Sequence, residues 1–211
     1  MNTLSTPDLA LGLYALFLAL AFGLRSLVQL RRTGSTGFRG ISGRPGSVEW
    51  LGGVLFAVAL ALGVAGCVLQ RAHVVAPLAL FDRVEVRLTG FALFALGTVA
   101  TLGAQVAMGA SWRIGVDASE RTALVTSGPF RIVRNPIFSA MLAGAAGLSL
   151  LVPNAVSLGA VVLLLCAVEI QVRLVEEPYL IQTHGADYLA YAAKTGRFLP
   201  FVGRLRGNHP E

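Results

Sequence analysis

The sequence predicts an all-α, polytopic membrane protein with about five transmembrane helices, and two observations support this class. Hydrophobic residues make up 55% of the 211 residues and charged residues 13%, with a mean hydropathy of +0.71. An ordinary soluble domain carries about 25% charged residues. The apolar residues are also gathered into runs that, as helices, are long enough to cross about 30 Å of hydrocarbon. We therefore expect the protein to lie in a lipid bilayer.

The apolar runs divide the chain into a series of expected helices. Three runs come before residue 111 and two follow residue 135, and the expected helices cover about 8–30, 48–69, 88–110, 136–152 and 154–175. Only Pro153 and Asn154 separate the last two, which predicts a tight helical hairpin that crosses fully or turns part way. We divide the chain into N-terminal helices (1–110), a core (111–200) and a tail (201–211).

Charge predicts the orientation of these helices. The net charge is +6, but the arginines gather in loops between apolar runs, which is typical of membrane topology rather than of nucleic-acid binding. Positive loops face the cytoplasm, so we expect the N-terminus outside and the C-terminus inside, in the plasma membrane of a bacterium. The arginines that support this are Arg31, Arg32, Arg39, Arg44, Arg113, Arg121, Arg131 and Arg134.

Small and polar residues within the apolar runs predict helix contacts. Glycines in the second run allow close approach of helices in lipid; they are Gly52, Gly53, Gly63 and Gly66. Gln105 is strongly polar at depth, so its amide either bonds across helices or lines a cavity. Cys67 and Cys166 lie in apolar runs, and they predict neither a disulfide nor a metal site.

A polar turn over residues 127–138 is the first candidate for chemistry. Gly128-Pro129 and Asn135-Pro136 both break helix, and Pro136 is suited to begin the helix that follows. The N-terminal end of that helix would present free N–H groups to the turn, where Arg131 and Arg134 add donors for an anion. The alternative is a plain cytoplasmic loop beside the membrane.

A second polar segment follows the fifth expected helix. Glu176 and Glu177 are adjacent, so they face different directions on a helix; one can reach a site while the other pairs with an arginine. Tyr188 and Tyr191 are three residues apart and should share one helix face. The alternative is a solvated helix end.

Together these two segments resemble a known family. The residues that carry the resemblance are Gly128-Pro129-Phe130, Arg134-Asn135-Pro136-Ile137-Phe138, Glu176-Glu177, Gly185-Ala186-Asp187-Tyr188-Leu189-Ala190-Tyr191 and Arg197-Phe198-Leu199-Pro200. In order and spacing they resemble the isoprenylcysteine carboxyl methyltransferases and their phospholipid methyltransferase relatives. The resemblance covers about 124–200, whereas the earlier helices match only in being hydrophobic.

The resemblance implies an integral membrane methyltransferase that uses S-adenosylmethionine and releases S-adenosylhomocysteine. It implies catalytic roles for Arg134 and Glu177, and no metal. The implied cofactor-binding residues are Gly128, Pro129, Phe130, Arg134, Asn135, Pro136, Phe138, Glu176, Glu177, Tyr188, Tyr191 and Arg197. Asn135 and Phe138 depart from the family, which often has His and Tyr there; Asn keeps a donor and an acceptor but has no titratable ring.

The acceptor of the methyl group is left open by the sequence. No residue stands out as a general base, which favours an oxygen nucleophile, and a lipophilic acceptor is expected to enter from the bilayer near the hairpin. The alternatives are a sterol-reductase-like NADPH-dependent membrane oxidoreductase, for which Arg121 and Arg131 leave a 2′-phosphate site open, and a membrane scaffold without activity. The oligomeric state is not predicted.

Overall fold

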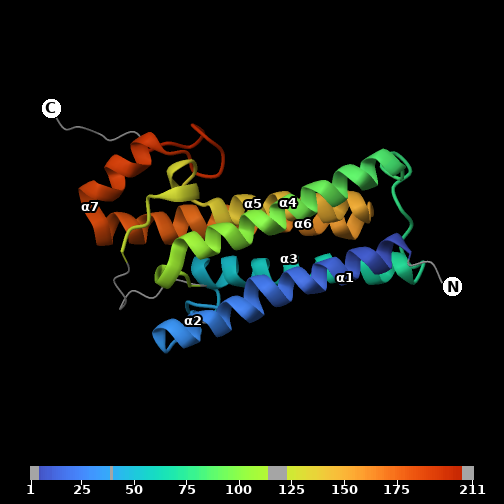
Figure 1. The fold of residues 1–211 in the computed structure, drawn as a ribbon, viewed down its shortest axis with the longest axis horizontal. Helices are drawn as coiled ribbons and strands as arrows, with labels where there is room; N and C mark the ends of the chain where they lie inside the picture. Colours follow the sequence, from blue (N-terminus) through green and yellow to red (C-terminus); the bar gives the residue numbers. More distant parts are fainter. Residues whose placement is uncertain (1–4, 39, 114–122, 206–211) are drawn as a thin grey trace.

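The chain folds into long helices that run roughly along one axis (Figure 1). The computed structural model describes residues 5–38, 40–113 and 123–205, so Arg39, Arg121 and most of the tail at 201–211 lie outside the described residues. The α-helices are α1 (Thr6–Leu18), α2 (Arg25–Thr33), α3 (Val48–Arg71), α4 (Val84–Met108), α5 (Pro136–Leu151), α6 (Ala155–Ile170) and α7 (Glu177–Lys194). The described residues contain no β-strand, which confirms the expected all-α class.

Two π-helical segments join pairs of these helices into longer ones. Ala19–Leu24 connects α1 to α2, and Gln171–Glu176 connects α6 to α7 without a break. A π turn is wider than an α turn and is frequent at functional sites. Gly185, with φ 51° and ψ −124°, then bends α7, a conformation that favours glycine.

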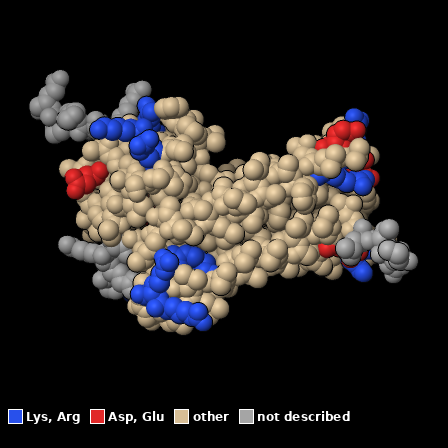
Figure 2. Space-filling model, viewed as in Figure 1, with Lys and Arg blue, Asp and Glu red and all other residues tan. Residues whose placement is uncertain are grey.

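Four of the described helices are long and apolar enough to cross a membrane. They are Thr6–Thr33, Val48–Arg71, Val84–Ser111 and Ala155–Lys194. The helix α5 has 16 residues, and at about 1.5 Å per residue it is shorter than a bilayer of about 30 Å. Four spans rather than five therefore meet the length required, although all five expected helices are present. Figure 2 shows that charged side chains gather at the two ends of the molecule, with an uncharged belt between them.

The expected hairpin of α5 and α6 is confirmed. Asn154 caps α6, because its Oδ1 accepts a hydrogen bond from the Ser157 backbone N–H at 2.9 Å. Its Nδ2 donates to the Gly66 carbonyl at 3.0 Å, so the same side chain holds the hairpin against α3. The two helices of the hairpin pack against different neighbours: α5 contacts α4, and α6 contacts α3.

Glycines bring α4 and α5 into direct backbone contact. A Cβ on Gly97 would lie 2.5 Å from the Gly144 nitrogen, and one on Gly147 would lie 2.4 Å from the Phe94 nitrogen. The glycines that the sequence singled out in α3 also pack closely: a Cβ on Gly66 would lie 2.2 Å from Ser157 Oγ. Small residues thus set the helix spacing, as expected in lipid.

Candidate functional site

The polar turn forms one wall of the candidate site. A short 3-10 helix, Gly128–Arg131, begins at Gly128 with φ 58° and buries Phe130, and α5 then begins at Pro136 as expected. The Tyr191 hydroxyl on α7 donates to the Phe130 carbonyl at 2.5 Å. The backbone N–H of Arg134 donates to the Gly196 carbonyl at 2.8 Å. The turn is therefore held against α7 and the segment that follows it.

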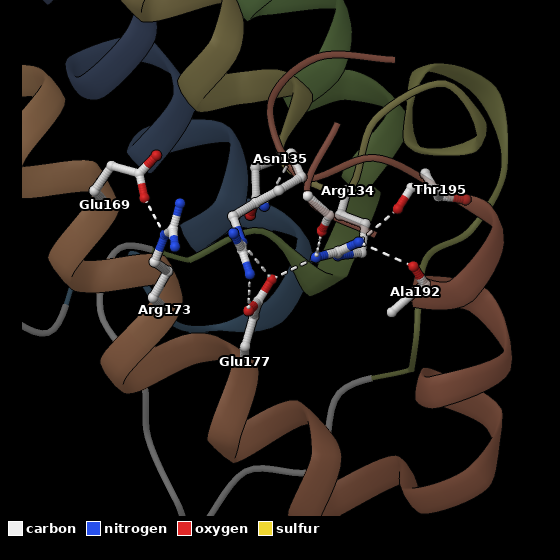
Figure 3. A network of polar contacts seen from close by, with 9 residues as sticks. Arg134, Asn135, Glu169, Arg173, Glu177, Ala192 and Thr195 are labelled. Atoms are coloured by element: carbon white, nitrogen blue, oxygen red, sulfur yellow. Dashed lines mark hydrogen bonds and ion pairs between the residues drawn. The ribbon is translucent and has the colours of Figure 1, made fainter. Parts of the chain in front are cut away.

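A buried ion-pair network links the turn to α7 (Figure 3). Arg134 Nη2 lies 2.6 Å from Glu177 Oε1, while Arg197 donates from Nε to Oε1 and from Nη2 to Oε2, both at 2.8 Å. The three residues are 5%, 5% and 9% exposed. The hydrogen bonds to Glu177 raise the pKa of the Arg197 guanidinium above its usual value. Both carboxylate oxygens of Glu177 are thus engaged within the protein.

Arg134 also holds the last turn of α7 and the chain that follows it. Its Nη1 donates to the carbonyls of Ala192 and Thr195, and its Nη2 donates to the Gly203 carbonyl at 3.0 Å (Figure 3). Its Nε is buried and has no hydrogen-bond partner in the described residues. A guanidinium spreads its donors in a fixed plane, which suits it to join several carbonyls and one carboxylate.

The two adjacent glutamates have different surroundings, as their spacing predicts. Glu177 pairs with the two arginines, whereas Glu176 is half-buried and lines a large cavity. This cavity has a volume of about 840 Å³ and lies at the end of the molecule that carries α2 and α7. It is large enough for a drug-sized molecule, for which pockets of about 300–1,000 Å³ are usual.

The outer wall of the cavity is polar and aromatic. The residues that form it lie on the turn, in the segment just after α4, in the π-helical segment Gln171–Glu176 and on α7; they include Trp112, Arg113, Asn135, Gln171, Glu176, Tyr179, Tyr188 and Tyr191. Tyr188 and Tyr191 share this wall, as expected, with their ring centroids 6.2 Å apart. Arg113 lies over the Tyr179 ring at 5.4 Å. This part of the wall combines charge, hydrogen bonding and flat aromatic surface.

The inner wall is mainly apolar and reaches toward the middle of the helices. Phe22, Phe56 and Phe138 form a chain of edge-to-face ring contacts, with centroids 6.4 and 6.3 Å apart. On α3 the wall extends from Glu49 to Leu60, which is about 16 Å at about 1.5 Å per residue. One cavity thus joins a polar region at the end of the molecule to an apolar region among the helices.

The structure brings most, but not all, of the expected site residues to this cavity. Those that line it are Phe130, Arg134, Asn135, Pro136, Phe138, Glu176, Tyr188 and Tyr191. Gly128, Pro129, Glu177 and Arg197 do not line it; Gly128 and Pro129 form the bend of the turn, and the other two belong to the ion-pair network. The geometry gives these four residues a part in holding the wall, and direct contact with a cofactor stays a prediction for all twelve.

Sequence reasoning missed the contribution of the N-terminal half. The first helix, α3 and residues 36, 38 and 40–42 between them all line the cavity, although the resemblance placed the site in the C-terminal half. Gly52 and Gly53, expected only to allow helix contacts, also belong to its wall. Gln105 does both things left open by the sequence, because it bonds to Ala21 across helices and lines the cavity.

A third buried arginine, Arg25, contacts Trp112. Arg25 lies 4.5 Å from the centre of the Trp112 ring, and its Nη2 donates to the Gly109 carbonyl at 2.6 Å. Gln29, one turn further along α2, donates to the Ala110 carbonyl at 2.7 Å. The first helix is thereby tied to the segment that follows α4, and this tie holds Trp112 in the cavity wall.

These features define a helical membrane protein with one large cavity whose walls are both polar and apolar. Residues 86–187 match the family model described as phospholipid methyltransferase, which belongs to the same group of membrane methyltransferases as the isoprenylcysteine carboxyl methyltransferases. The match confirms the resemblance and does not favour the sterol-reductase alternative. It ends within α7, so Tyr188, Tyr191 and Arg197 lie beyond it. A comparison with curated proteins finds no match.

Proposed function

We propose that the protein transfers a methyl group from S-adenosylmethionine to a lipophilic acceptor within the membrane. The observation that carries this proposal is a continuous cavity of about 840 Å³, which extends from a polar aromatic wall to an apolar one. A charged cofactor needs polar surroundings and a lipophilic acceptor needs apolar ones, and the two must lie side by side for the methyl group to be transferred. The family match supports the reaction type.

The residues of the outer wall fit the parts of the cofactor. Glu176 offers a carboxylate to an ammonium or to ribose hydroxyls, and the buried Arg134 Nε is a donor without a partner among the residues that the structure describes. Trp112, Tyr188 and Tyr191 offer aromatic faces to adenine and to a sulfonium cation.

The chemistry asks little of the protein beyond alignment. S-adenosylmethionine supplies an activated methyl group on sulfur, so that the new bond from acceptor to methyl forms as the sulfur–methyl bond breaks and the thioether leaves. The wall residues bind and orient the two partners and exclude water. Asn135 lines the cavity with an amide, which can orient a group but cannot take up a proton.

We place the cavity on the cytoplasmic side of a bacterial plasma membrane, with the N-terminus outside. Arg31 and Arg32 lie in the last turn of α2, and Arg44 follows in the next loop; these arginines support this orientation. Figure 2 shows Lys and Arg side chains at the end of the molecule that carries α2 and α7. The acceptor then enters between the first helix and α3, whose apolar side chains line the inner wall, and beside the start of α5.

The test is a calorimetric titration of S-adenosylhomocysteine into the detergent-purified protein, with NADPH in parallel. We expect micromolar binding of the former and none of the latter. A Glu176→Gln variant should weaken the binding of S-adenosylhomocysteine, because it removes the charge from the cavity wall. Binding of NADPH without binding of S-adenosylhomocysteine would overturn the proposal. It would indicate that the arginines of the turn bind the phosphate groups of NADPH.

A further inference from the structure

Gln105 is a buried residue of the cavity wall, and one end of its amide has no hydrogen-bond partner in the described residues. It lies on α4 and is 2% exposed. Its Nε2 donates to the Ala21 carbonyl at 2.9 Å, in the π-helical segment of the first helix. Its Oε1 is buried and has no hydrogen-bond partner in the described residues. Such an acceptor receives no hydrogen bond from the protein around it.

The orientation of this amide is determined by its neighbour. The Ala21 carbonyl can only accept a hydrogen bond, so it requires the nitrogen end of Gln105, and the oxygen is necessarily the free end. Thr101, one turn earlier on the same helix and also fully buried, shows the contrast. Its hydroxyl donates to the Gly97 carbonyl at 2.8 Å and is satisfied within α4.

Unpaired polar atoms gather on this cavity. Within the described residues, six buried side-chain atoms have no hydrogen-bond partner, and three of them belong to residues that line the cavity: Ser42 Oγ, Gln105 Oε1 and Arg134 Nε. Native proteins leave few buried polar groups unpaired. A concentration of them around one cavity is expected where a ligand supplies the missing partners.

We propose that Gln105 Oε1 accepts a hydrogen bond from a hydroxyl or N–H group carried by the lipophilic acceptor. The surrounding wall includes Phe22 on the first helix and Met141 on α5, so the donor arrives on an otherwise apolar molecule. A site built around a buried acceptor discriminates against analogues that lack the donor. This inference takes the cavity as the acceptor site, and so it rests on the proposed function.

The experiment compares two ligands that differ only in this donor. The chain has two tryptophans, so Trp50→Phe leaves Trp112, in the cavity wall, as the single fluorescent reporter. Quenching of this reporter by 11-bromo-1-undecanol and by its methyl ether is measured in nanodiscs. We expect the alcohol to bind about three- to tenfold more tightly, as one neutral hydrogen bond provides. Gln105→Met should reduce this ratio to that of lipid partitioning alone.

Two further variants keep the test decisive. Thr101→Val removes a buried hydroxyl from the same helix outside the cavity and should keep the wild-type ratio. Gln105→Asn shortens the side chain by one methylene and so moves the carbonyl away from the ligand. This variant replaces Gln105→Met if the latter does not fold, and it should also lower the ratio of the two affinities. An unchanged ratio of the two affinities in the Gln105 variants would overturn the inference, since water and not the ligand would then donate to the amide oxygen. An equal loss of affinity for the alcohol and for its methyl ether would also overturn it, because the substitution would then act through the bond to Ala21 and not through the donor on the ligand.

Failure of this inference is separable from failure of the proposed function. If neither bromo compound quenches Trp112, the inference falls, because the cavity then does not take a lipophilic donor. The titration of S-adenosylhomocysteine uses a different ligand and no bromo compound, so its result stands by itself. Binding of S-adenosylhomocysteine together with an unchanged ratio would keep the methyltransferase and remove only the role of Gln105.

Discussion

Glu177 and Arg197 face each other with two parallel hydrogen bonds, both 2.8 Å long, from the guanidinium to the two carboxylate oxygens. They are 20 residues apart, and Glu177 begins α7 while Arg197 follows it, so the pair closes the last helix onto its own continuation. Arg134 joins the same carboxylate from the turn. A bidentate pair of this kind fixes direction as well as distance. The network therefore sets the shape of the cavity wall.

Replacing Glu177 with Ala should destabilise the fold. The change leaves two buried guanidinium groups without a counter-charge, which costs about 3–5 kcal/mol for a broken buried ion pair. We expect a clear fall in the thermal unfolding midpoint in mild detergent, with loss of S-adenosylhomocysteine binding as a consequence.

The neighbouring glutamate is the matched control for that variant. Glu176→Gln changes a half-buried residue of the cavity wall, and we expect the unfolding midpoint to stay near that of the wild type. Binding of S-adenosylhomocysteine should weaken by about tenfold or more, as when a charged hydrogen bond is lost. If instead Glu177→Ala keeps the unfolding midpoint of the wild type and still loses binding of S-adenosylhomocysteine, then Glu177 contacts the cofactor directly.

The beginning of α5 and the hairpin after it were predictable because their signals are local. Pro136 pre-sets the backbone of a first helical turn, and Pro153 with Asn154 interrupts one helix and caps the next. The different surroundings of Glu176 and Glu177 also follow from helix geometry alone. Which arginines pair with Glu177 was not predictable, because Arg134 is 43 positions distant and their contact depends on the tertiary fold.

The apolar part of the cavity was not predictable for a different reason. Phe22 and Phe56 lie in runs in which nearly every residue is apolar, and an apolar side chain suits both lipid and a cavity for a lipophilic molecule. Periodicity therefore does not separate the two. The π-helical segments that join helices also leave no clear composition signal, so the long helix Ala155–Lys194 was expected to end near residue 175.

Adding a methyl group at Gly97 should disrupt the contact between α4 and α5. The Cβ of Gly97→Ala would lie 2.5 Å from a backbone nitrogen of α5, so the two helices must separate, at a cost of about 1–3 kcal/mol. Because α5 carries Phe138 and Met141 in the cavity wall, ligand binding should weaken too. Gly103→Ala on the same helix meets nothing within 4 Å and should be neutral or slightly stabilising. Equal unfolding midpoints for the two variants would contradict this packing.

Asn135 stands at a position where the family often has His, and the variant Asn135→His tests the role of this side chain. Its Nδ2 donates to the Arg197 carbonyl at 3.2 Å, a bond that a neutral imidazole N–H can replace. We expect Asn135→His to bind S-adenosylhomocysteine within a few-fold of the wild type at pH 8. Below about pH 6.5 the ring takes up a proton. It then repels the arginines nearby, so binding should fall between pH 8 and pH 5.5 more than it does in the wild type. Parallel titration of Asn135→Ala separates loss of the bond from gain of charge: it should bind more weakly at both pH values, by a similar factor.

Tyr191 should matter for ligand binding through the turn that it holds. Tyr191→Phe removes the hydroxyl that donates to the Phe130 carbonyl, and the loss of one such bond costs about 1 kcal/mol. Tyr14→Phe is the matched control, because the Tyr14 hydroxyl also donates to a backbone carbonyl, that of Leu60, but Tyr14 is absent from the wall of the large cavity. Both variants should lower the unfolding midpoint by a similar amount. Only Tyr191→Phe should also weaken the binding of S-adenosylhomocysteine, since it frees the turn between Gly128 and Pro136. Equal affinities in the two variants would show that the turn keeps its position without this bond.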